Sequence, residues 1–418
     1  MRKRKQHTEL VTGIDIGSSA VRVVVGQQTV NEHGNPRLQV ISALSVPSEG
    51  VGKGIITSIE EVISSIANAL EKTERTVGVP IEHAWIGVSG VQVLSQASRG
   101  VISVAKPDGE ISREDVERAV DAAKTVPIPI NYELLHVVPK SFVIDGQAGI
   151  RDPIGMNGLR LELDTTMIYV GSSHIKNISK SVYRTGIDID DLVLSALAIG
   201  DACASPKQKD LGVAVLSIGA STTTMIVYEG GDVQHIATLP VGAEHVTNDL
   251  AIGLRTSIEV AERVKRAYGS CTKKEGDKEK MIALSEFGGE AEKVPVSYVH
   301  DIVYARTKEI FEKVNQELTT IERKRKLPAG VVITGGGANL EGITHCAKEV
   351  LELPAVLGFP RGVELVAETA EDLSYATAIA FLVWGSNMEN VAMDRSGGFS
   401  QAKRALGGLK KVGKWLMP

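Results

Sequence analysis

The sequence predicts an α/β protein built from two similar halves, and three observations favour this fold class. The segment GIDIGSSAVRVVV at residues 13–25 sets two apolar, β-branched runs around a Gly-Ser-Ser turn, the pattern of a β-hairpin. The same order of strand, Ile-Gly, hydroxyl-rich turn and strand recurs at residues 213–231 as VAVLSIGASTTTMIVYEGG. Each copy precedes another strand pattern and then a helical pattern, which indicates an internal duplication.

Asp15 is the most informative residue of the first hairpin because it interrupts an apolar strand between Ile14 and Ile16. A buried carboxylate is costly unless it is paired, hydrogen-bonded or bound to a metal. A turn whose backbone N–H groups cradle phosphate and magnesium would supply such a partner. An ordinary hairpin with a satisfied aspartate is an equally good interpretation of this motif alone. Two such hairpins opposed across a cleft would clamp one nucleotide.

A third glycine turn, VVITGGGANLEGI at residues 331–343, follows a β-branched strand and opens a helical pattern. Its backbone can approach a ligand closely, although GGG alone is also compatible with a tight strand-to-helix turn. Between the two hairpins, residues 83–166 carry their own strands and a helix predicted to begin after Ser112, which indicates an inserted module. Residues 246–325 hold two long helical patterns around a lysine-rich stretch.

The bulk composition excludes several classes of protein. A net charge of -5 with 23% charged and 43% hydrophobic residues describes a folded globular chain and provides no basic field for nucleic acid. The 3 cysteines lack metal-site spacing, so we expect buried thiols in a reducing compartment. No run reaches the ~18 apolar residues of a transmembrane helix, so any membrane contact is expected to be peripheral.

The end of the chain predicts a linker, residues 386–399, and then a basic amphipathic helix, residues 400–418. Apolar residues fall on one arc of its helical projection and lysines on the other, and a helix docked on the protein's own body is the alternative to membrane binding. The residues predicted to contact a membrane are Leu406, Leu409, Lys410, Lys411, Val412, Lys414, Trp415 and Leu416.

With these features together, the chain resembles the actin, Hsp70 and sugar-kinase superfamily, and within it the FtsA family of bacterial cell-division proteins. The resemblance rests on GIDIGSS, GKGIITSIEEVISSI, ELLHVVPKSFVIDGQAGIRDPIGMNGLRLEL, PVGAEHVTNDLA, TGGGANLEGI and SYATAIAFLVWG. It implies an actin-like, ribonuclease H-like duplicated fold with two lobes around a nucleotide cleft, an inserted α+β subdomain and a C-terminal amphipathic helix. The implied organisation is a first core subdomain at 8–82, 167–209 and 370–385, the insert at 83–166, a second core subdomain at 210–245 and 326–369, and a further subdomain at 246–325.

The resemblance also implies a binding site for ATP and magnesium. The first phosphate loop would be formed by Asp15, Gly17, Ser18 and Ser19, with Asp15 near the magnesium, and the second by Gly219, Ala220, Ser221 and Thr222. Glu262 and Lys265, three residues apart on one helix face, would contact ribose and adenine, although an ordinary surface ion pair is the alternative. Gly335, Gly336 and Gly337 would approach the nucleotide.

Relatives often carry an acid where this chain has Ser217, and an uncharged hydroxyl is a poor base. We therefore expect ATP binding with weak or slow hydrolysis, so whether the protein acts as an enzyme stays open.

The implied role is to tether the tubulin-like FtsZ ring to the cytoplasmic face of the cell membrane at the division site, by self-assembly into actin-like filaments, and to recruit later division proteins. Arg306, Lys308 and Lys313 are candidates to meet the acidic C-terminal peptide of FtsZ, and a solvated helix face is the alternative. A pilus-type or other actin-like assembly ATPase is the competing function. A small-molecule kinase is less favoured because no substrate base with a supporting motif is found.

Overall fold

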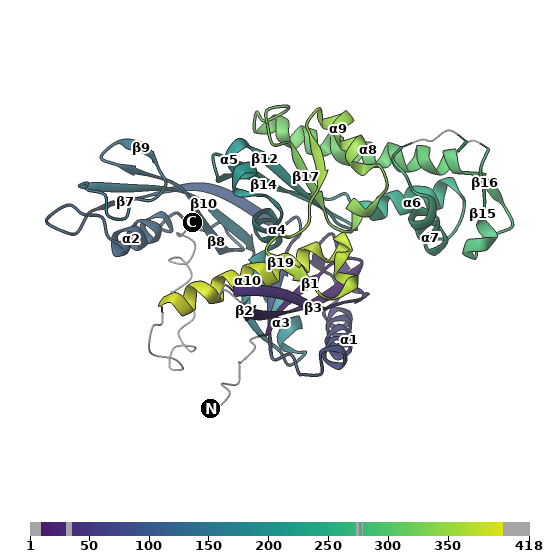
Figure 1. Cartoon of the computed structure of the whole chain (residues 1–418), viewed down its shortest axis with the longest axis horizontal. Coiled ribbons are helices and arrows are strands. Elements are labelled where there is room, and N and C mark those ends of the chain that lie inside the picture. The colour runs from purple at the N-terminus through teal and green to yellow at the C-terminus, as the bar shows by residue number, and fades with distance from the viewer. Residues whose placement is uncertain (1–9, 31–35, 273–275, 278, 396–418) are drawn as a thin grey trace. The chain divides into compact units, whose positions relative to one another are not determined.

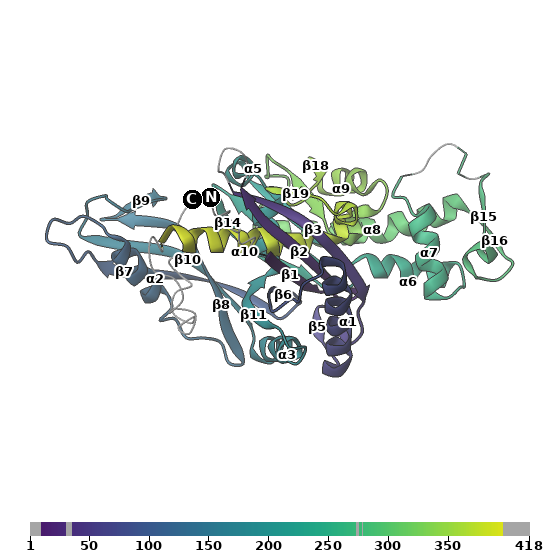
Figure 2. The same cartoon turned by 60° about the horizontal axis from the view of Figure 1, so that its bottom comes forward.

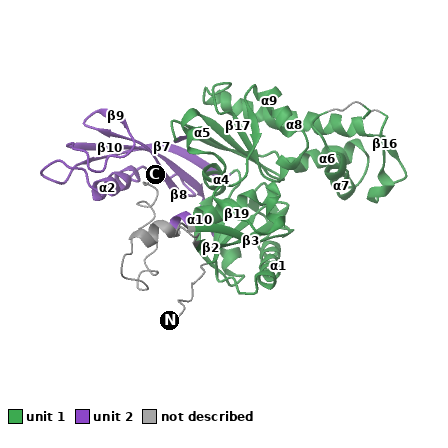
Figure 3. Cartoon of the chain, viewed as in Figure 1, with its two compact units in different colours: residues 1–91, 177–231, 235–384 green, residues 92–176, 232–234, 385–418 purple. Residues whose placement is uncertain are grey.

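The computed structural model describes residues 10–30, 36–272, 276–277 and 279–395. The chain divides into two compact units, one made of residues 1–91, 177–231 and 235–384 and the other of residues 92–176, 232–234 and 385–418 (Figure 3).

The first half of the larger unit is built on a six-stranded sheet with the order β11-β6-β1-β2-β3-β19. Strands β1 and β2, rich in buried valine and isoleucine, form an antiparallel hairpin. On one side β6 and then β11 continue the sheet in parallel, and on the other β19 pairs in parallel with β3. The strands are β1 (Leu10–Ile16), β2 (Ala20–Val30), β3 (Pro36–Pro47), β6 (His83–Val88), β11 (Asp188–Leu194) and β19 (Val363–Leu365), with the small ladder β4 (Val51–Gly52) and β5 (Ile55–Ile56).

Helices cover this sheet, and the first part of α10 runs alongside it in both views (Figures 1 and 2). The packing is close because a Cβ placed on Gly13 of β1 would lie 2.5 Å from the carbonyl oxygen of Ala378 on α10. The helical segments of this half are α1 (Ile59–Val77), α3 (Ser172–Tyr183), α10 (Ala376–Arg395), η3 (Glu368–Glu371) and η4 (Leu373–Tyr375).

The second half repeats this plan in a five-stranded sheet with the order β14-β13-β12-β17-β18. Here β12 and β13 form the antiparallel hairpin, and β17 and β18 continue in parallel beside β12. In each half the first strand therefore lies between the second strand of its hairpin and a later parallel strand, as an internal duplication predicts. The strands are β12 (Val213–Ile218), β13 (Thr223–Glu229), β14 (Asp232–Leu239), β17 (Val331–Thr334) and β18 (Ala355–Leu357).

Three helices between β14 and β17 pack together at one end of the unit, with α6 and α7 beside the long helix α8 in both views (Figures 1 and 2). One contiguous buried core joins these helices to the second sheet. The elements are α6 (Ala243–Gly253), α7 (Ile258–Tyr268), β15 (Met281–Ala283), η1 (Leu284–Phe287), β16 (Lys293–Pro295) and α8 (Val296–Thr320). The remaining helical segments are α4 (Ser195–Cys203), α5 (Pro206–Leu211), η2 (Gly336–Asn339) and α9 (Ile343–Leu351).

The smaller unit is a four-stranded sheet with the order β7-β10-β8-β9, packed on one helix. Ser112 caps that helix, α2, as its sequence predicts, and Asp115 completes the reciprocal capping box. The elements are β7 (Val93–Ser103), α2 (Arg113–Ala123), β8 (Tyr132–Ile144), β9 (Gln147–Ile150) and β10 (Arg160–Gly171).

Two predicted boundaries are wrong. The insert was expected to begin at residue 83, but β6 at His83–Val88 belongs to the core sheet, because it pairs in parallel with β1 at one edge and with β11 at the other, and five of its six residues are buried. The linker was expected at 386–399, but α10 continues to Arg395 because adding residues to an existing helix costs little. Among the described residues, no helix combines the length and apolar character that a membrane span requires.

Candidate functional site

The two hairpin turns that the sequence predicts have the same internal geometry. In the first, the N–H of Gly17 donates to the carbonyl of Ala20 at 3.1 Å, and in the second the N–H of Gly219 donates to the carbonyl of Thr222 at 2.8 Å. The turns are therefore equivalent positions of the duplicated fold. We call them loop 1 (17–19) and loop 2 (219–222).

The tips of the two loops meet. The hydroxyl of Ser221 donates to the hydroxyl of Ser18 at 2.6 Å, and the N–H of Gly54 also donates to Ser18 at 3.3 Å. Within the described part of the chain, the N–H groups of Ser18, Ser19, Ala220 and Ser221 donate to no protein acceptor. Backbone N–H groups gathered in this way at two facing turns form an anion-binding arrangement.

Asp15 lies one residue before the end of β1, and its side chain is 16% exposed. Cross-strand pairing sets it opposite Arg22 on β2, and the two side chains approach to 4.0 Å, at the outer limit of an ion pair. Burial raises the pKa of Asp15, and the positive charge of Arg22 opposes that shift only in part. Asp15 is thus a partly compensated carboxylate that retains capacity for a cation.

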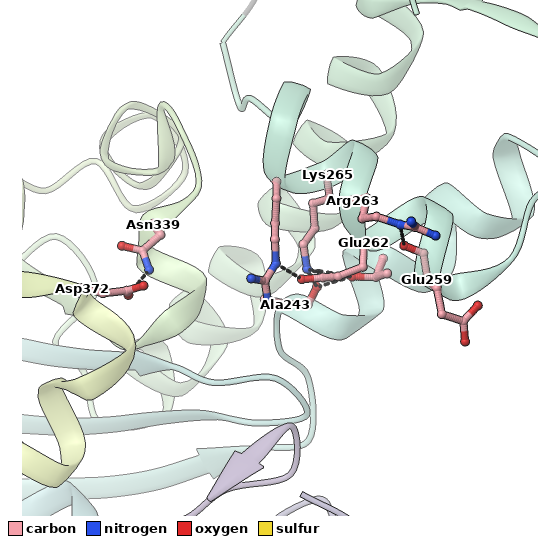
Figure 4. Close-up of polar contacts among 9 residues, drawn as sticks. Ala243, Glu259, Glu262, Arg263, Lys265, Asn339 and Asp372 are labelled. Atoms are coloured by element: carbon pink, nitrogen blue, oxygen red, sulfur yellow. Dashed lines mark hydrogen bonds and ion pairs between the residues drawn. The ribbon is translucent and has the colours of Figure 1, made fainter. Parts of the chain in front are cut away.

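The predicted ribose and adenine residues are fixed to the base of loop 2. The first N–H groups of α6, from Ala243 and Glu244, donate to the carbonyls of Gly219 and Ala220, each at 2.9 Å. Lys265 on α7 then donates to the carbonyl of Ala243 at 3.3 Å (Figure 4). Lys265 therefore lies one hydrogen bond from the helix turn that holds loop 2.

Glu262 and Lys265 form an ion pair at 2.5 Å, and the hydroxyl of Thr247 on α6 contacts both side chains, Lys265 at 2.7 Å and Glu262 at 2.6 Å. Burial works to raise the pKa of Glu262, but Lys265 and hydrogen bonds from Thr247 and Arg266 hold that pKa below its usual value. Figure 4 shows this cluster on α6 and α7. Glu262 and Lys265 are thus more than an isolated surface pair, since a second helix orders them.

The three glycines of the GGG turn have different surroundings. A Cβ on Gly335, whose φ is +86°, would lie 2.7 Å from the carbonyl oxygen of Ile218, and one on Gly337 would lie 2.5 Å from the Ile218 side chain. These two glycines are required for packing against the strand that enters loop 2. A Cβ on Gly336 would make only an ordinary contact, 3.4 Å from Ser374. Gly336 is thus the glycine whose missing side chain the protein's own packing does not explain.

These residues fit a nucleotide with magnesium. Loops 1 and 2 offer unclaimed N–H donors to phosphate oxygens, and Asp15 offers the carboxylate oxygen that magnesium prefers. Glu262 and Lys265 place an acceptor and a donor near the helix turn that holds loop 2.

The three cations predicted to meet FtsZ lie on α8, and each has a carboxylate partner in the structure. Arg306 makes a two-bond contact with Asp249 at 2.6 and 3.0 Å and also pairs with Glu309. Lys308 pairs with Glu312 at 3.9 Å, and Lys313 lies 3.6 Å from Glu309. An acidic peptide would therefore have to displace or join existing ion pairs on this face.

The predicted membrane-binding residues, Leu406 to Leu416, lie outside the described residues.

Sequence reasoning missed three residues near the loops, Arg22, Asn339 and Asp372. The signal for Arg22 was present, because counting outward from the Gly-Ser-Ser turn pairs it with Asp15 across the hairpin. Asn339 and Asp372 belong to segments far apart in sequence and hydrogen-bond at 2.6 Å (Figure 4), which no local pattern indicates.

Two sheets of equivalent strand order with facing hairpin turns define an actin-like α/β protein. Solved structures agree: the chain is similar to the "PilM-PilN type IV pilus biogenesis complex" with a TM-score of 0.62 and 16% identity, covering 90% of this chain and 98% of that one. It is also similar to MreB 5 of Spiroplasma citri bound to AMPPNP, with a TM-score of 0.52 and 12% identity, covering 93% and 99%. At these identities the likeness shows the fold, which confirms the predicted actin-like class.

Sequence comparison is more specific. The cell division protein FtsA of Bacillus subtilis is 34% identical over 96% of this chain and 88% of its own length, and that of Pseudomonas aeruginosa is 31% identical over 94% and 93%. Residues 214–380 match the family profile "Cell division protein FtsA", and residues 90–169 match "SHS2 domain inserted in FTSA". The chain belongs to the FtsA family of cell division proteins, and the predicted inserted subdomain is confirmed.

Proposed function

We propose that this protein binds ATP and magnesium between loops 1 and 2, assembles into actin-like filaments, and tethers the FtsZ ring to the cytoplasmic face of the cell membrane. In this proposal the N–H groups of Ser18, Ser19, Ala220 and Ser221 bind the phosphates. When bound, magnesium would neutralise phosphate charge, and Asp15 is the residue that would hold it. Lys265, Glu262 and Gly336 adjoin the sugar and base.

The observation that carries the nucleotide part of the proposal is the meeting of two equivalent turns with unclaimed N–H donors. A single anion-binding turn occurs in many proteins that bind no nucleotide. Two turns from duplicated halves, hydrogen-bonded through Ser18 and Ser221, can bind the phosphate groups of one nucleotide from two sides.

The proposal includes slow hydrolysis. Ser217 occupies in β12 the position that Asp15 occupies in β1, since each residue lies two before the first glycine of its loop. The second loop therefore brings no carboxylate to orient water at the phosphate end, which weakens transition-state assistance. Nucleotide then acts mainly to bias conformation and assembly.

The tethering part rests on family membership and on the tail at residues 400–418. Lys308 and Lys313 on α8 are the partner residues most open to an acidic FtsZ peptide, and the inserted unit serves filament contacts and recruitment of later division proteins. The five cations of the tail attach weakly one at a time, so assembly into filaments supplies stable membrane binding by avidity.

Two measurements on the full-length protein and on a variant lacking residues 400–418 test this proposal. Equilibrium titration with a fluorescent ATP analogue and magnesium is expected to show equal affinity for both proteins. Sedimentation with vesicles containing anionic lipid is expected to retain only the full-length protein. Absence of nucleotide binding refutes the site, and a tailless protein that still sediments with vesicles refutes the tether.

A further inference from the structure

Arg22 lies in a row of side chains that crosses three strands. Asp15 on β1 is paired in register with Arg22 on β2, and Arg22 is paired with Ser45 on β3. Side chains in one such row point to the same face of a sheet. Arg22 is largely buried, it reaches Asp15 only at 4.0 Å, and its Nε has no hydrogen-bond partner in the described part of the protein. At that distance the guanidinium forms no hydrogen bond with Asp15.

The segment before α10 lies against this row. The N–H of Val366 donates to the carbonyl of Val40 at 3.0 Å, and the hydroxyl of Thr369 donates to the carbonyl of Ala43 at 3.0 Å. The hydroxyl of Tyr375 then donates to that of Ser45 at 3.3 Å. Contacts along β3 therefore bring η4 beside Arg22.

Asp372 is the carboxylate of this segment. It caps η4 by accepting from the N–H of Ser374 at 2.8 Å, and it accepts from Asn339 at 2.6 Å (Figure 4). Burial works to raise the pKa of Asp372, but the bonds from Ser374 and Asn339 and the charge of Arg22 hold that pKa below its usual value. The positive charge of Arg22 therefore acts on two carboxylates, Asp15 on the strand that enters loop 1 and Asp372 on the segment that packs against β3.

We propose that Asp372 is a positioning residue that shares Arg22 with Asp15, and so keeps Asp15 available to magnesium. Arg22 and the metal compete for the same carboxylate, because both are cations that Asp15 can bind. A second negative charge at residue 372 holds the guanidinium back from Asp15. This inference rests on the proposed nucleotide site.

The test is Asp372→Asn, which retains an oxygen for Ser374 and Asn339 and removes only the charge. The readout is the gain in affinity for a fluorescent ATP analogue that magnesium confers, measured with magnesium chloride and with EDTA. A purely structural role leaves that ratio unchanged. We expect D372N to reduce the gain about five- to tenfold. Without the charge of Asp372, Arg22 would bind Asp15 more tightly by about 1 kcal/mol or slightly more, and magnesium would have to overcome that difference. Asn339→Ala, which keeps the charge, is the matched control and is expected to retain the full gain.

A double-mutant cycle makes the mechanism specific. If Asp372 acts by holding Arg22, then D372N has no further effect in an Arg22→Gln background. A crystal structure of D372N without nucleotide is expected to place Arg22 in hydrogen-bond contact with Asp15. The inference is overturned if magnesium raises the nucleotide affinity of D372N as much as that of the unsubstituted protein. It is also overturned if Arg22 and Asp15 remain 4.0 Å apart in D372N. Failure of the unsubstituted protein to bind the analogue at all instead refutes the nucleotide site itself.

Discussion

The pKa values of two buried aspartates are shifted in opposite directions, because their hydrogen-bond partners differ. Burial raises the pKa of Asp15, and the charge of Arg22, 4.0 Å away, opposes that shift only in part. Burial also works to raise the pKa of Asp115 in the inserted unit, but hydrogen bonds from Ser112, Arg118 and Ala105 lower that pKa far below the usual range. Asp115 is thus satisfied by its own unit, whereas the partly compensated Asp15 is the candidate cation ligand of the proposed site.

This contrast predicts opposite effects of two isosteric substitutions on stability. Burial raises the pKa of Asp15 in the folded state, so folding favours the protonated carboxyl. The resulting stability is fully present below pH 3.8, the unfolded-state pKa, and is lost as pH rises through the folded-state pKa. Asp15→Asn is therefore expected to raise the melting temperature at neutral pH and to weaken magnesium binding about 10- to 100-fold.

Asp115→Asn serves as the matched control. The lowered pKa of Asp115 gives stability above the unfolded-state value, lost as pH falls, so this variant is expected to be destabilised at neutral pH by about 1–3 kcal/mol. Thermal unfolding between acidic and neutral pH measures both effects. Destabilisation of D15N at neutral pH would mean that the chain itself satisfies Asp15.

Ser217 gives a prediction about catalysis. Placing an acid there by Ser217→Asp restores in the second half the residue type that the first half has at position 15, so ATP turnover is expected to rise about tenfold or more. Steady-state phosphate release measures the effect, and a folded variant with unchanged or lower turnover contradicts the account of slow hydrolysis.

At the scale of elements, we expect the GGG turn to combine packing with access for a ligand. Gly337→Ala is expected to destabilise the protein by about 1–3 kcal/mol, because its Cβ would overlap Ile218. Gly336→Ala is expected to leave stability nearly unchanged while weakening nucleotide binding. Chemical denaturation and nucleotide titration on the two variants separate the roles, and equal nucleotide affinity of G336A and the unsubstituted protein would remove Gly336 from the site.

Helix α8 allows a similar separation for partner binding. Lys308 and Lys313 hold only long ion pairs at 3.9 and 3.6 Å, whereas Arg306 is locked to Asp249. Reversing the charges, Lys308→Glu with Lys313→Glu, is expected to weaken binding of an FtsZ C-terminal peptide about tenfold without loss of fold. Fluorescence anisotropy measures this effect, and unchanged affinity would assign these lysines to a solvated face.

The elements that could be predicted from the sequence are those set by local chemistry. The Gly-Ser-Ser turn, the Ser112 cap and the GGG turn each follow from a few neighbouring residues. The place of β6 could not be predicted, because its apolar strand reads the same whether it pairs within an insert or with β1 and β11. Likewise the contact between Asn339 and Asp372 could not be predicted, because it joins two separate segments of the chain.

At the scale of the whole molecule, the inserted unit is attached through adjacent chain ends. The N–H of Gly171 donates to the carbonyl of Gln92 at 3.2 Å, and β7 and β10 pair in register from these ends outward. An insertion whose ends meet leaves its host fold little disturbed. The unit also has its own core around Ile111, Phe142 and Leu161.

Residues 92–171 are therefore expected to fold when expressed alone, with cooperative thermal unfolding and dispersed amide resonances. The remaining chain, closed by a short glycine linker, is expected to bind nucleotide with an affinity within about threefold of the intact protein. Loss of nucleotide binding in a folded remainder would show that the site depends on the insert.

The central claim is that two equivalent turns bind one nucleotide from opposite sides. A crystal structure of the protein with magnesium and a non-hydrolysable ATP analogue tests it most directly. The account predicts phosphate oxygens within hydrogen-bond distance of the N–H groups of Ser18, Ser19, Ala220 and Ser221, with the metal next to Asp15. Phosphates bound by one loop alone, or an Asp15 that remains paired with Arg22 and apart from the metal, would contradict it.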